Sequence, residues 1–385
     1  CDAVYLGLEK FGARAYSDNF TIDSLAEAIR YAHLRDVKIY VTMNTIVFED
    51  EICDMRQQLD ALNGIGVDGI IVQDLAVFDY VAANFADMEV HCSTQMGVDD
   101  LEGTMLLKEM GADRVVLARE VDLADVKKIR KAAKIPIEVF VHGALCVSYS
   151  GNCLMSGLIG YRSGNRGRCV GSCRKPYELL ERESGRSYGT SYLLSMKDLN
   201  TIDHIEDLKA IDSLKIEGRM KSPEYVFAVV AAYRAAIDRL ACAIDEGTPL
   251  EEAGATEEEH RALSEAFSRG FTEAYLSRRR GNDIMGYGRP NNRGVFAGRV
   301  TKAKGREVAV ESQTELHEGD VLEFWTNKGH FASTLEAFER KGDMYYFEID
   351  GRVGKGDRVF RVRDASMAFH DDDLEPRLPA RMHVV

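Results

Sequence analysis

The chain has 385 residues, and its 49 Lys and Arg against 63 Asp and Glu give a formal net charge of −14 at pH 7. This acidic balance argues against a broad basic surface for nucleic acid, but it leaves room for a local basic site. Apolar residues make up 45% and charged residues 29% of the chain, as in a folded globular protein rather than a disordered one. The sequence holds no apolar run of about 18 residues, so we expect no membrane span.

The first part of the chain alternates between short apolar runs and helix-length amphipathic stretches. We expect strands at 2–7, 37–41, 69–72, 88–92, 114–117 and 137–142, and helices at 23–35, 51–64, 75–86, 98–110 and 122–133. A further strand at 212–216 and a helix at 222–245 follow after a long interruption. Strands that alternate with helices at this spacing predict a parallel sheet with helical crossovers.

Polar residues at the carboxyl ends of these strands help to choose between two α/β folds. They include Thr42, Gln73, His91, Arg119, His142, Glu217 and Arg219. A (β/α)8 barrel of the TIM type places its active site at this edge, which favours a barrel over an open doubly wound sheet. Because the pattern supplies seven strands and the sequence begins at Cys1 rather than Met, we expect the first barrel unit to be missing at the N-terminus.

The pattern changes after the barrel. We expect the barrel over residues 1–245 with a Cys-rich insertion at 143–177, a helical connector at 246–293 with a helix at 256–280, a small antiparallel β-barrel at 294–368, and a linker or tail at 369–385. The small barrel is predicted from short alternating runs at 295–301, 307–312, 320–326, 330–337, 343–350 and 357–363. The tail contains the acidic run 371–373, which indicates a solvated segment.

Four of the eight cysteines lie within 28 residues. Cys146, Cys153, Cys169 and Cys173 follow the spacing C-x6-C, fifteen residues, C-x3-C, in a segment that starts at a strand end. Structural zinc favours tight C-x2–4-C pairs, and only the second half fits. Iron–sulfur clusters use four thiolates at irregular spacing, and four unconnected cysteines are the remaining alternative. One local cluster in a long acidic chain indicates a metal or redox site in the cytoplasm rather than an extracellular disulfide scaffold.

The same segment is locally basic, because no Asp or Glu occurs from Leu154 to Tyr177. Its cations are Arg162, Arg166, Arg168, Arg174 and Lys175. In a chain of net charge −14, this surplus either compensates an anionic cluster or binds an anion, such as RNA phosphate or a dicarboxylate.

The motifs around the cysteines are similar to those of a known family. The segment from Glu138 to Ser156 resembles the signature of peptidase family U32, the collagenase-like proteins. Further matching stretches are Val4–Gly7, His91–Gln95, Asn165–Arg174 and Leu214–Arg219. The resemblance covers about residues 1–300, and the stretch Ile284–Val295 resembles the branch that includes the ribosomal-RNA hydroxylation proteins.

This resemblance implies a reaction and a cofactor. Members of the family are implicated in oxygen-independent hydroxylation of a tRNA wobble uridine, a ribosomal RNA cytidine or the ubiquinone ring. They carry a 4Fe–4S cluster, and prephenate is the implied hydroxyl source. For this chain the resemblance implies hydroxylation of an RNA base in the cytoplasm, with RNA and a small dicarboxylate as partners. The sequence does not indicate the target or the oligomeric state.

The resemblance also bears on the cluster ligands. Some relatives place the fourth cysteine just before the stretch Leu214–Arg219, where this chain has Asp212. We therefore infer that Cys169 and Cys173 both bind the cluster, together with Cys146 and Cys153.

Several strand-end groups are candidates for the remaining roles. His142 and Glu217 are the candidate catalytic residues, although His142 can equally be a histidine whose hydrogen bonds are satisfied at a strand end. The candidate substrate-binding residues are Arg119, Glu138, Arg174 and Arg219. Arginine can grip a carboxylate with two parallel hydrogen bonds, and prephenate carries two carboxylates.

Proteolysis is the main alternative function. The chain has neither a His-Glu-x-x-His zinc motif nor a Gly-x-Ser-x-Gly nucleophile elbow. A thiol protease built on Cys146 and His142 is conceivable, but it needs a free thiol that a cluster would use. A hydroxylase of a quinone or another small-molecule ring, and a non-catalytic RNA-binding module, are the further alternatives.

Overall fold

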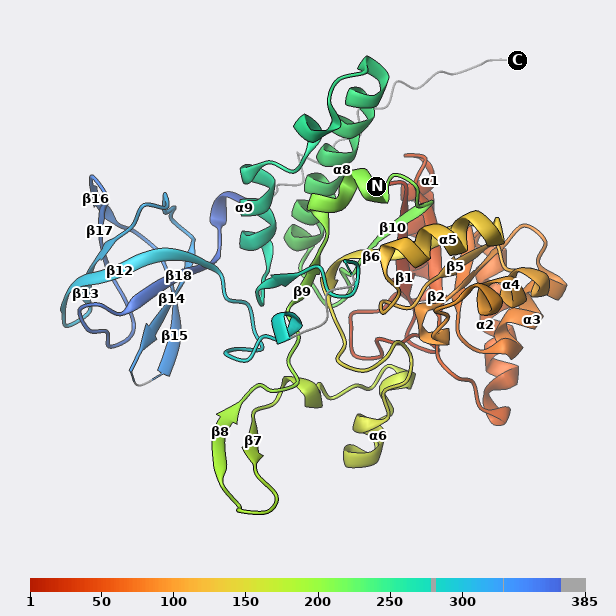
Figure 1. Cartoon of the computed structure of the whole chain (residues 1–385), viewed down its shortest axis with the longest axis horizontal. Helices are drawn as coiled ribbons and strands as arrows, with labels where there is room; N and C mark the ends of the chain where they lie inside the picture. Colours follow the sequence, from red (N-terminus) through yellow and green to blue (C-terminus); the bar gives the residue numbers. More distant parts are fainter. Residues whose placement is uncertain (278–281, 328, 368–385) are drawn as a thin grey trace. The chain divides into compact units, whose positions relative to one another are not determined.

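The computed structural model describes residues 1–277, 282–327 and 329–367 (Figure 1). Contacts divide the chain into two compact units. The first comprises Cys1–Met220 with Thr272–Met285, and the second comprises Lys221–Phe271 with the segment that starts at Gly286. Among the described residues, no helix combines the length and the apolar character needed to cross a membrane.

The first unit is built on seven parallel strands that pair in chain order. They are β1 Ala3–Gly7, β2 Lys38–Met43, β3 Gly69–Val72, β4 Glu89–Cys92, β5 Arg114–Val116, β6 Ile137–Ala144 and β10 Ser213–Ile216. All four residues of β3 are buried, as expected for a parallel strand that is covered on both faces.

Helices connect these strands. They are α1 Ile22–His33, α2 Ile52–Gly64, α3 Leu75–Asn84, α4 Leu101–Met110, α5 Leu123–Ala133 and α7 Ile205–Leu208. Four of them, α1, α3, α4 and α5, begin where a side chain caps a free backbone N–H group. The side chain of Asp100 accepts a hydrogen bond from the Gly103 N–H at 2.7 Å. This cap fixes the start of α4 at Leu101, later than the helix predicted from residue 98.

Side chains join the first and last strands of the parallel order. The Tyr5 hydroxyl donates to the Ile216 carbonyl at 3.4 Å, and the Lys215 ammonium lies 4.5 Å from the centre of the Tyr5 ring. The side chains of β1 and β10, the two end strands of the parallel order, are therefore in contact.

Irregular structure fills the interruption between β6 and β10. It contains α6 Met155–Gly160, a hairpin of β7 Tyr177–Leu180 and β8 Ser187–Ser191, and the short β9 Asp198–Asn200. β9 pairs antiparallel with the end of β6, where Ala144 faces Asp198. The hairpin was not predicted, because its strands are largely exposed and lack an apolar alternation.

The second unit contains an antiparallel sheet in the order β15-β14-β18-β12-β13-β17-β16. The strands are β12 Val295–Lys304, β13 Glu307–Glu311, β14 Val321–Thr326, β15 Gly329–Thr334, β16 Glu339–Lys341, β17 Met344–Glu348 and β18 Arg358–Arg363. Its core includes Val310, Phe324, Tyr345 and Val359, which are all 0% exposed. The predicted α/β class, with a parallel sheet and a separate antiparallel sheet, is confirmed.

Two helices, α8 Pro223–Glu246 and α9 Glu257–Ala266, also belong to the second unit. The contacts thus group α8 apart from the parallel strands, with which the sequence analysis had placed it. The helix predicted at 256–280 ends early, because the Ser268 N–H donates to Asn292 Oδ1 at 2.9 Å and Gly270 has a φ of +89°. The short β11 Phe271–Thr272 follows. The end of that predicted helix, 278–280, and the predicted tail at 369–385 lie outside the described residues.

Candidate active site

The cysteine segment leaves the sheet at the end of β6 and folds back onto the loops that follow other parallel strands. Gly151 has a φ of +76°, and a Cβ atom there would lie 2.0 Å from the Gln95 carbonyl oxygen. Gly167 has a φ of +75°, and its Cβ atom would lie 2.5 Å from the Gly12 carbonyl oxygen. Only glycine fits both positions, so these two residues allow the segment to lie against the loops after β1 and β4.

The four predicted ligand cysteines share one electrostatic neighbourhood. Burial, the largest influence, raises the pKa of Cys173, and the charges of the other three cysteines raise it further, whereas Arg174 lowers it. All four cysteines have free thiols. Cys146 and Cys169 are exposed, and Cys153 and Cys173 are partly exposed. The segment therefore gathers four accessible thiols in one region.

The arrangement of these sulfurs is looser than one metal ion requires. Among the described residues, no three of them lie within 4.8 Å of one another. A tetrahedral zinc site, with Zn–S bonds of about 2.3 Å, would hold its sulfurs roughly 3.8 Å apart. Two donors point at Cys169 Sγ, the Gly171 N–H at 3.4 Å and the Ser156 hydroxyl at 3.7 Å. Such donors stabilise a thiolate, as a metal ligand requires.

Glu217 lies directly after β10 and collects two arginines and a tyrosine. Its Oε2 lies 3.2 Å from Arg14 Nη2 and 3.9 Å from Arg119 Nη2, and its Oε1 accepts from the Tyr5 hydroxyl at 3.4 Å. The Glu217 N–H donates to the His142 carbonyl at 2.9 Å. These contacts hold a 7%-exposed carboxylate at the carboxyl ends of β6 and β10.

Arg219 lies at the same edge, and its hydrogen-bond acceptors among the described residues are neutral. Its guanidinium donates to Thr42 Oγ1 at 3.1 Å, Ser17 Oγ at 3.2 Å and Asn19 Oδ1 at 2.9 Å. Burial, and after it the positive charge of Arg14, lowers the pKa of Arg219. A Cβ atom on Gly7 would lie 2.3 Å from Arg219 Nη2, so the guanidinium occupies space that only a glycine leaves open.

Arg14 links this edge to the cysteines. Its pKa is raised most by the charge of Glu217 and further by the charges of Cys169 and Cys146. Its side chain is 38% exposed, so it can reach a ligand. The sequence analysis missed Arg14, because the residue lies well beyond the end of β1 and outside the strand-end positions. Three guanidinium groups thus surround one carboxylate beside the cysteines.

Glu138 lies elsewhere, in the amino-terminal half of the parallel sheet. It accepts from Lys215 Nζ at 2.7 Å, from the Ser213 hydroxyl at 2.7 Å and from Arg114 Nη1 at 3.2 Å. Burial, the largest influence, acts to raise the pKa of Glu138, but Lys215, Ser213 and Arg114 together outweigh it and lower the pKa to about 2. This carboxylate is held by the sheet itself.

Arg174 holds the two ends of the cysteine segment together. Its guanidinium donates to Ser195 Oγ at 2.8 Å and to the Leu145 carbonyl at 2.9 Å. Because Leu145 precedes Cys146 and Arg174 follows Cys173, these bonds link the first and last of the four cysteines. The structure gives Arg174 a positioning geometry within the segment.

His142 is 1% exposed and lies on β6, opposite Asn200 of β9. It lies beyond a β-bulge of this strand, because Phe140 pairs with Lys215 of β10 and the next pair is His142 with Ile216. The structure therefore brings Arg119, Glu217 and Arg219 to one edge, ties the His142 backbone to Glu217, and places Glu138 and Arg174 in separate networks.

The basic segment is only partly available to a ligand. Arg166 forms two contacts with the Glu51 carboxylate, one of them at 2.8 Å, and also donates to the Ile46 carbonyl. Arg162 lies 4.8 Å from the centre of the Tyr16 ring. Arg166 is thus part of the scaffold, whereas Arg162 lies on the surface.

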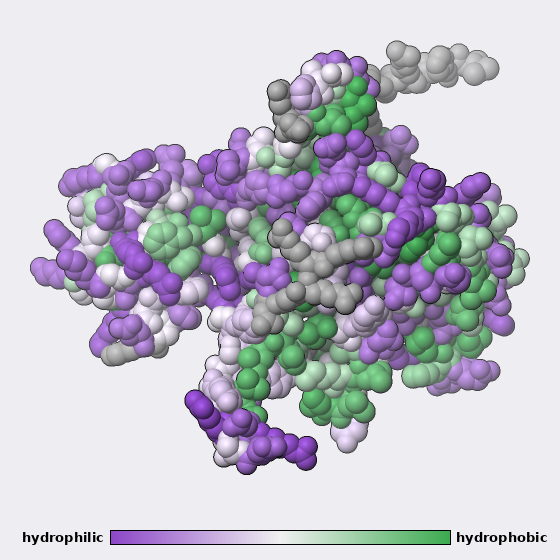
Figure 2. Space-filling view, viewed as in Figure 1, coloured by the Kyte–Doolittle hydropathy of each residue, from purple (hydrophilic) through white to green (hydrophobic). Residues whose placement is uncertain are grey.

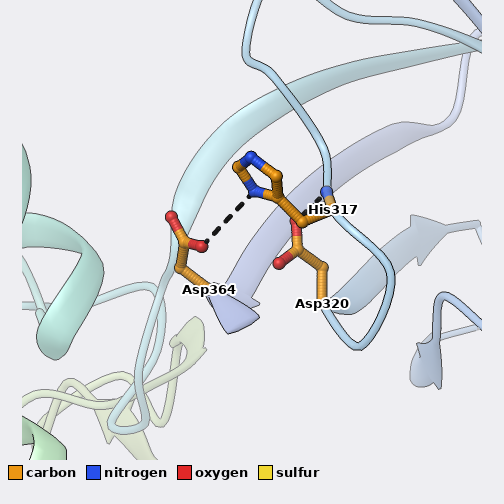
Figure 3. A group of neighbouring side chains, drawn as sticks. All are labelled: His317, Asp320 and Asp364. Atoms are coloured by element: carbon orange, nitrogen blue, oxygen red, sulfur yellow. Dashed lines mark hydrogen bonds and ion pairs between the residues drawn. The ribbon is translucent and has the colours of Figure 1, made fainter. Parts of the chain in front are cut away.

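A second polar cluster, which the sequence analysis did not identify, lies in the second unit (Figure 3). His317 Nδ1 lies 3.6 Å from Asp364 Oδ1, and the His317 N–H donates to Asp320 Oδ2 at 3.0 Å. Arg361 approaches both carboxylates, at 3.5 Å from Asp320 and 2.9 Å from Asp364, and also pairs with Glu265. Since the buried guanidinium of Arg361 pairs with all three carboxylates, the cluster is a structural ion-pair network.

Comparisons with known proteins give the chain's relationships. Residues 1–286 match the sequence profile described as "Peptidase family U32". The chain is 35% identical over 352 residues to the Escherichia coli (strain K12) protein named "23S rRNA 5-hydroxycytidine C2501 synthase", across 90% of this chain and 52% of that protein. It is 40% identical over 245 residues to "tRNA hydroxylation protein P1" of Bacillus subtilis (strain 168), across 62% of this chain and 58% of that protein.

A relative with a different kind of name matches almost as well. The Porphyromonas gingivalis protein named "Collagenase" is 36% identical over 343 residues, across 83% of this chain and 80% of that protein. The chain spans little more than half the length of the two RNA-hydroxylation relatives. The match to the family profile covers the sheet, the cysteine segment and the arginines described above.

Proposed function

The chain belongs to peptidase family U32, and on this premise we propose that it is an enzyme that hydroxylates a base of ribosomal RNA or tRNA without molecular oxygen. The names of the Escherichia coli and Bacillus subtilis relatives support this reaction. The structural observation that carries the proposal is the group of four interacting thiols beside Arg14.

The proposed scaffold is a (β/α)8 barrel of the TIM type. Seven parallel strands in chain order, with β1 and β10 in side-chain contact, support this architecture. The polar residues at the carboxyl ends of the strands then line one mouth, where such barrels hold their active sites.

The proposed cofactor is a 4Fe–4S cluster bound by Cys146, Cys153, Cys169 and Cys173. The donor set is all sulfur, and four thiolates at irregular spacing in the chain are the ligands that iron–sulfur clusters use. When bound, the cluster would supply redox or Lewis-acid chemistry at its iron atoms. Gly171 and Ser156 would donate hydrogen bonds to one ligand sulfur, and Arg174 would hold the first and last ligands in place.

The proposed hydroxyl donor is prephenate, a dicarboxylate. Arg119 and Arg219, with Arg14 in addition, supply guanidinium groups for its carboxylates. The exchange balances if the hydroxyl group passes from a donor carbon to the base carbon while the hydrogen of the base passes to the donor. In this scheme Glu217 and His142 hold and move the proton at the mouth. An RNA substrate and four reduced thiols together support a cytoplasmic location.

Metal analysis tests the cofactor. Protein purified without oxygen should contain about four iron and four sulfide per chain. Cys146→Ser and Cys169→Ser should lose most of this iron. Cys92→Ser is the control, since that thiol is buried, and burial followed by the charge of Asp113 raises the pKa of Cys92 to about 12. Stoichiometric zinc without sulfide would overturn the proposed cluster.

Nucleoside analysis tests the reaction. Ribosomal RNA and tRNA from a strain that lacks the gene should lose one hydroxylated nucleoside. The wild-type gene should restore it, and the Cys146→Ser gene should not. Intact RNA modification together with loss of a hydroxylated quinone would assign the enzyme to a small-molecule ring instead.

Proteolysis remains the second candidate, and the name "Collagenase" of one relative favours it. A thiol protease requires Cys146, which is exposed, as a free nucleophile. The two functions make opposite demands on this residue. Under proteolysis, Cys146→Ser should abolish cleavage of a collagen-like peptide and leave the metal content unchanged.

A further inference from the structure

A row of aromatic rings crosses four neighbouring strands of the antiparallel sheet in the second unit. Phe296 of β12 lies 5.5 Å from Phe360 of β18, measured between ring centres. Phe360 lies 4.5 Å from Trp325 of β14, and Trp325 lies 4.8 Å from His330 of β15. We call these four residues the aromatic row.

The aromatic row lies on the face of the sheet that points away from the core. Phe324 and Val359, which adjoin Trp325 and Phe360 in sequence, are both 0% exposed and belong to the core. Because side chains alternate along a strand, Trp325 and Phe360 point to the opposite face. Phe296 is 47% exposed and His330 is exposed. Figure 2 shows apolar residues over β12 and β18 with hydrophilic residues around them.

Arginines lie over these rings. The guanidinium carbon of Arg358 lies 4.9 Å from the centre of the Trp325 ring, and that of Arg299 lies 5.8 Å from the centre of the Phe296 ring. Within the described ranges, neither Arg358 nor Arg299 has a carboxylate partner at ion-pair distance. Arg299 donates to the Gly356 carbonyl at 3.0 Å, but neither positive charge is offset by a carboxylate, so both can attract an anion to this partly exposed aromatic surface.

We propose that the aromatic row and its arginines are a docking surface for single-stranded RNA. Proteins that bind single strands combine aromatic rings, on which bases stack, with cations that contact the phosphates. Cross-strand aromatic pairs also stabilise a sheet, but that role needs neither a half-exposed Phe296 nor unpaired arginines over the rings. The choice of RNA rests on the proposed function, whereas the surface itself does not.

The position of this surface in the chain supports a role in target selection. The match to the family profile ends at residue 286, and the antiparallel sheet begins at Val295. The surface therefore lies outside the part that the family profile describes. A surface of this kind can select the RNA while the first unit supplies the chemistry.

The chain contains one tryptophan, Trp325, which makes its fluorescence a direct reporter of the row. The experiment uses the full chain and a fluorescein-labelled oligoadenylate of about twelve nucleotides, a length that suits single-strand sites. Unlabelled oligoadenylate should quench the tryptophan emission along the same binding curve that the anisotropy of the labelled strand gives.

Variants distinguish base stacking on the aromatic row from general electrostatic attraction of the RNA. Phe296→Leu and Phe360→Leu should each weaken binding about tenfold, as loss of one stacked base predicts. Arg358→Gln should lower the slope of log affinity against log salt by about one. The matched control is Tyr346→Leu, because Tyr346 is also exposed on this sheet, has Lys341 5.5 Å from its ring centre, and lies on β17 outside the row. It should bind like the wild type.

Two results would overturn the proposal: tryptophan emission that stays constant while the strand saturates the protein, or equal loss in Tyr346→Leu and the row variants. The proposed reaction is judged separately, from iron content and hydroxylated nucleosides. A protein that binds oligoadenylate through the row but leaves every nucleoside unmodified would retain the docking surface and refute the hydroxylase. Normal hydroxylation by a protein whose aromatic row binds no RNA would retain the hydroxylase and refute the docking surface.

Discussion

The two halves of the parallel sheet hold their buried charges in different ways. In the amino-terminal half, Glu138 has a lysine at 2.7 Å and an arginine at 3.2 Å, and it is 6% exposed. At the carboxyl edge, the nearest cation contacts of Glu217 are longer, 3.2 Å to Arg14 and 3.9 Å to Arg119, and Arg14 is 38% exposed. Glu138 is therefore tightly paired within the sheet, whereas several arginines lie near the single carboxylate of Glu217.

This difference separates scaffold from binding site. A tight buried pair has lost its water, so removal of one partner leaves an unsolvated charge at a large cost. A loosely held and partly exposed cation such as Arg14 can exchange a protein carboxylate for a ligand carboxylate at little cost. We therefore expect Glu138 to stabilise the sheet, and we propose that Arg14 with its neighbours binds the ligand.

The largest effect is expected from Glu138→Gln. The change leaves the ammonium of Lys215 buried without its carboxylate, and we expect a loss of about 3 to 5 kcal/mol in the free energy of unfolding. Urea unfolding followed by circular dichroism measures it. The control is Glu217→Gln, which should cost about 1 kcal/mol, because Arg14 can take up water. Equal losses in the two variants would erase the distinction between the halves.

Acid should act on the same pair. The pKa of Glu138 is about 2 in the folded protein against a usual value of 4.5, so its contribution to stability is fully present above about pH 4.5. It is lost as the pH falls from there toward 2, and amounts to something on the order of 3 kcal/mol. The free energy of unfolding in urea should therefore fall more steeply below about pH 4.5 for the wild type than for Glu138→Gln. Parallel pH curves for the two proteins would contradict the depressed pKa.

Arg14→Gln tests the open edge. Loss of a charged hydrogen-bond donor should weaken prephenate binding by about tenfold or more, measured by calorimetry without oxygen, and should leave the iron content near that of the wild type. Arg162→Gln is the control, since it removes the same charge from the surface of the cysteine segment. If Arg14→Gln instead loses iron and keeps its affinity for prephenate, the positive charge of Arg14 stabilises the cluster rather than binding prephenate.

The sequence predicted the parts of this molecule that follow a simple period. The seven parallel strands alternate with helices, and buried runs such as 69–72 identify strands without further information. The helix predicted at 256–280 was wrong in its second half, because the pairing of Ser268 with Asn292 depends on a segment distant in sequence. β16 was missed because its three residues are all exposed.

The sequence predicted that candidate residues at the carboxyl ends of strands lie at one edge of the sheet. Arg119, Glu217 and Arg219 meet at one edge because the carboxyl ends of parallel strands do so. Glu138 lies on the same strand as His142 but near its other end, so its side chain joins the tightly paired network in the amino-terminal half of the sheet. Arg14 was missed, because a loop that returns over the sheet leaves no periodic signal in the sequence.

The smallest expected effect comes from a single methyl group at the open edge. In Gly7→Ala the new Cβ atom would lie 2.3 Å from Arg219 Nη2, and the flexible end of the arginine can move away at little cost to the fold. We expect the free energy of unfolding to change by less than about 1 kcal/mol, while prephenate binding weakens by roughly threefold. The control is Gly64→Ala at the end of α2, where no atom lies within 4 Å of the new Cβ atom, and which should gain about 0.5 kcal/mol with no change in binding. Unchanged prephenate affinity in Gly7→Ala would remove Arg219 from the proposed ligand site and leave Arg14 and Arg119 as its cations. An unfolded Gly7→Ala protein would instead show that this edge is packed as tightly as the half of the sheet that holds Glu138.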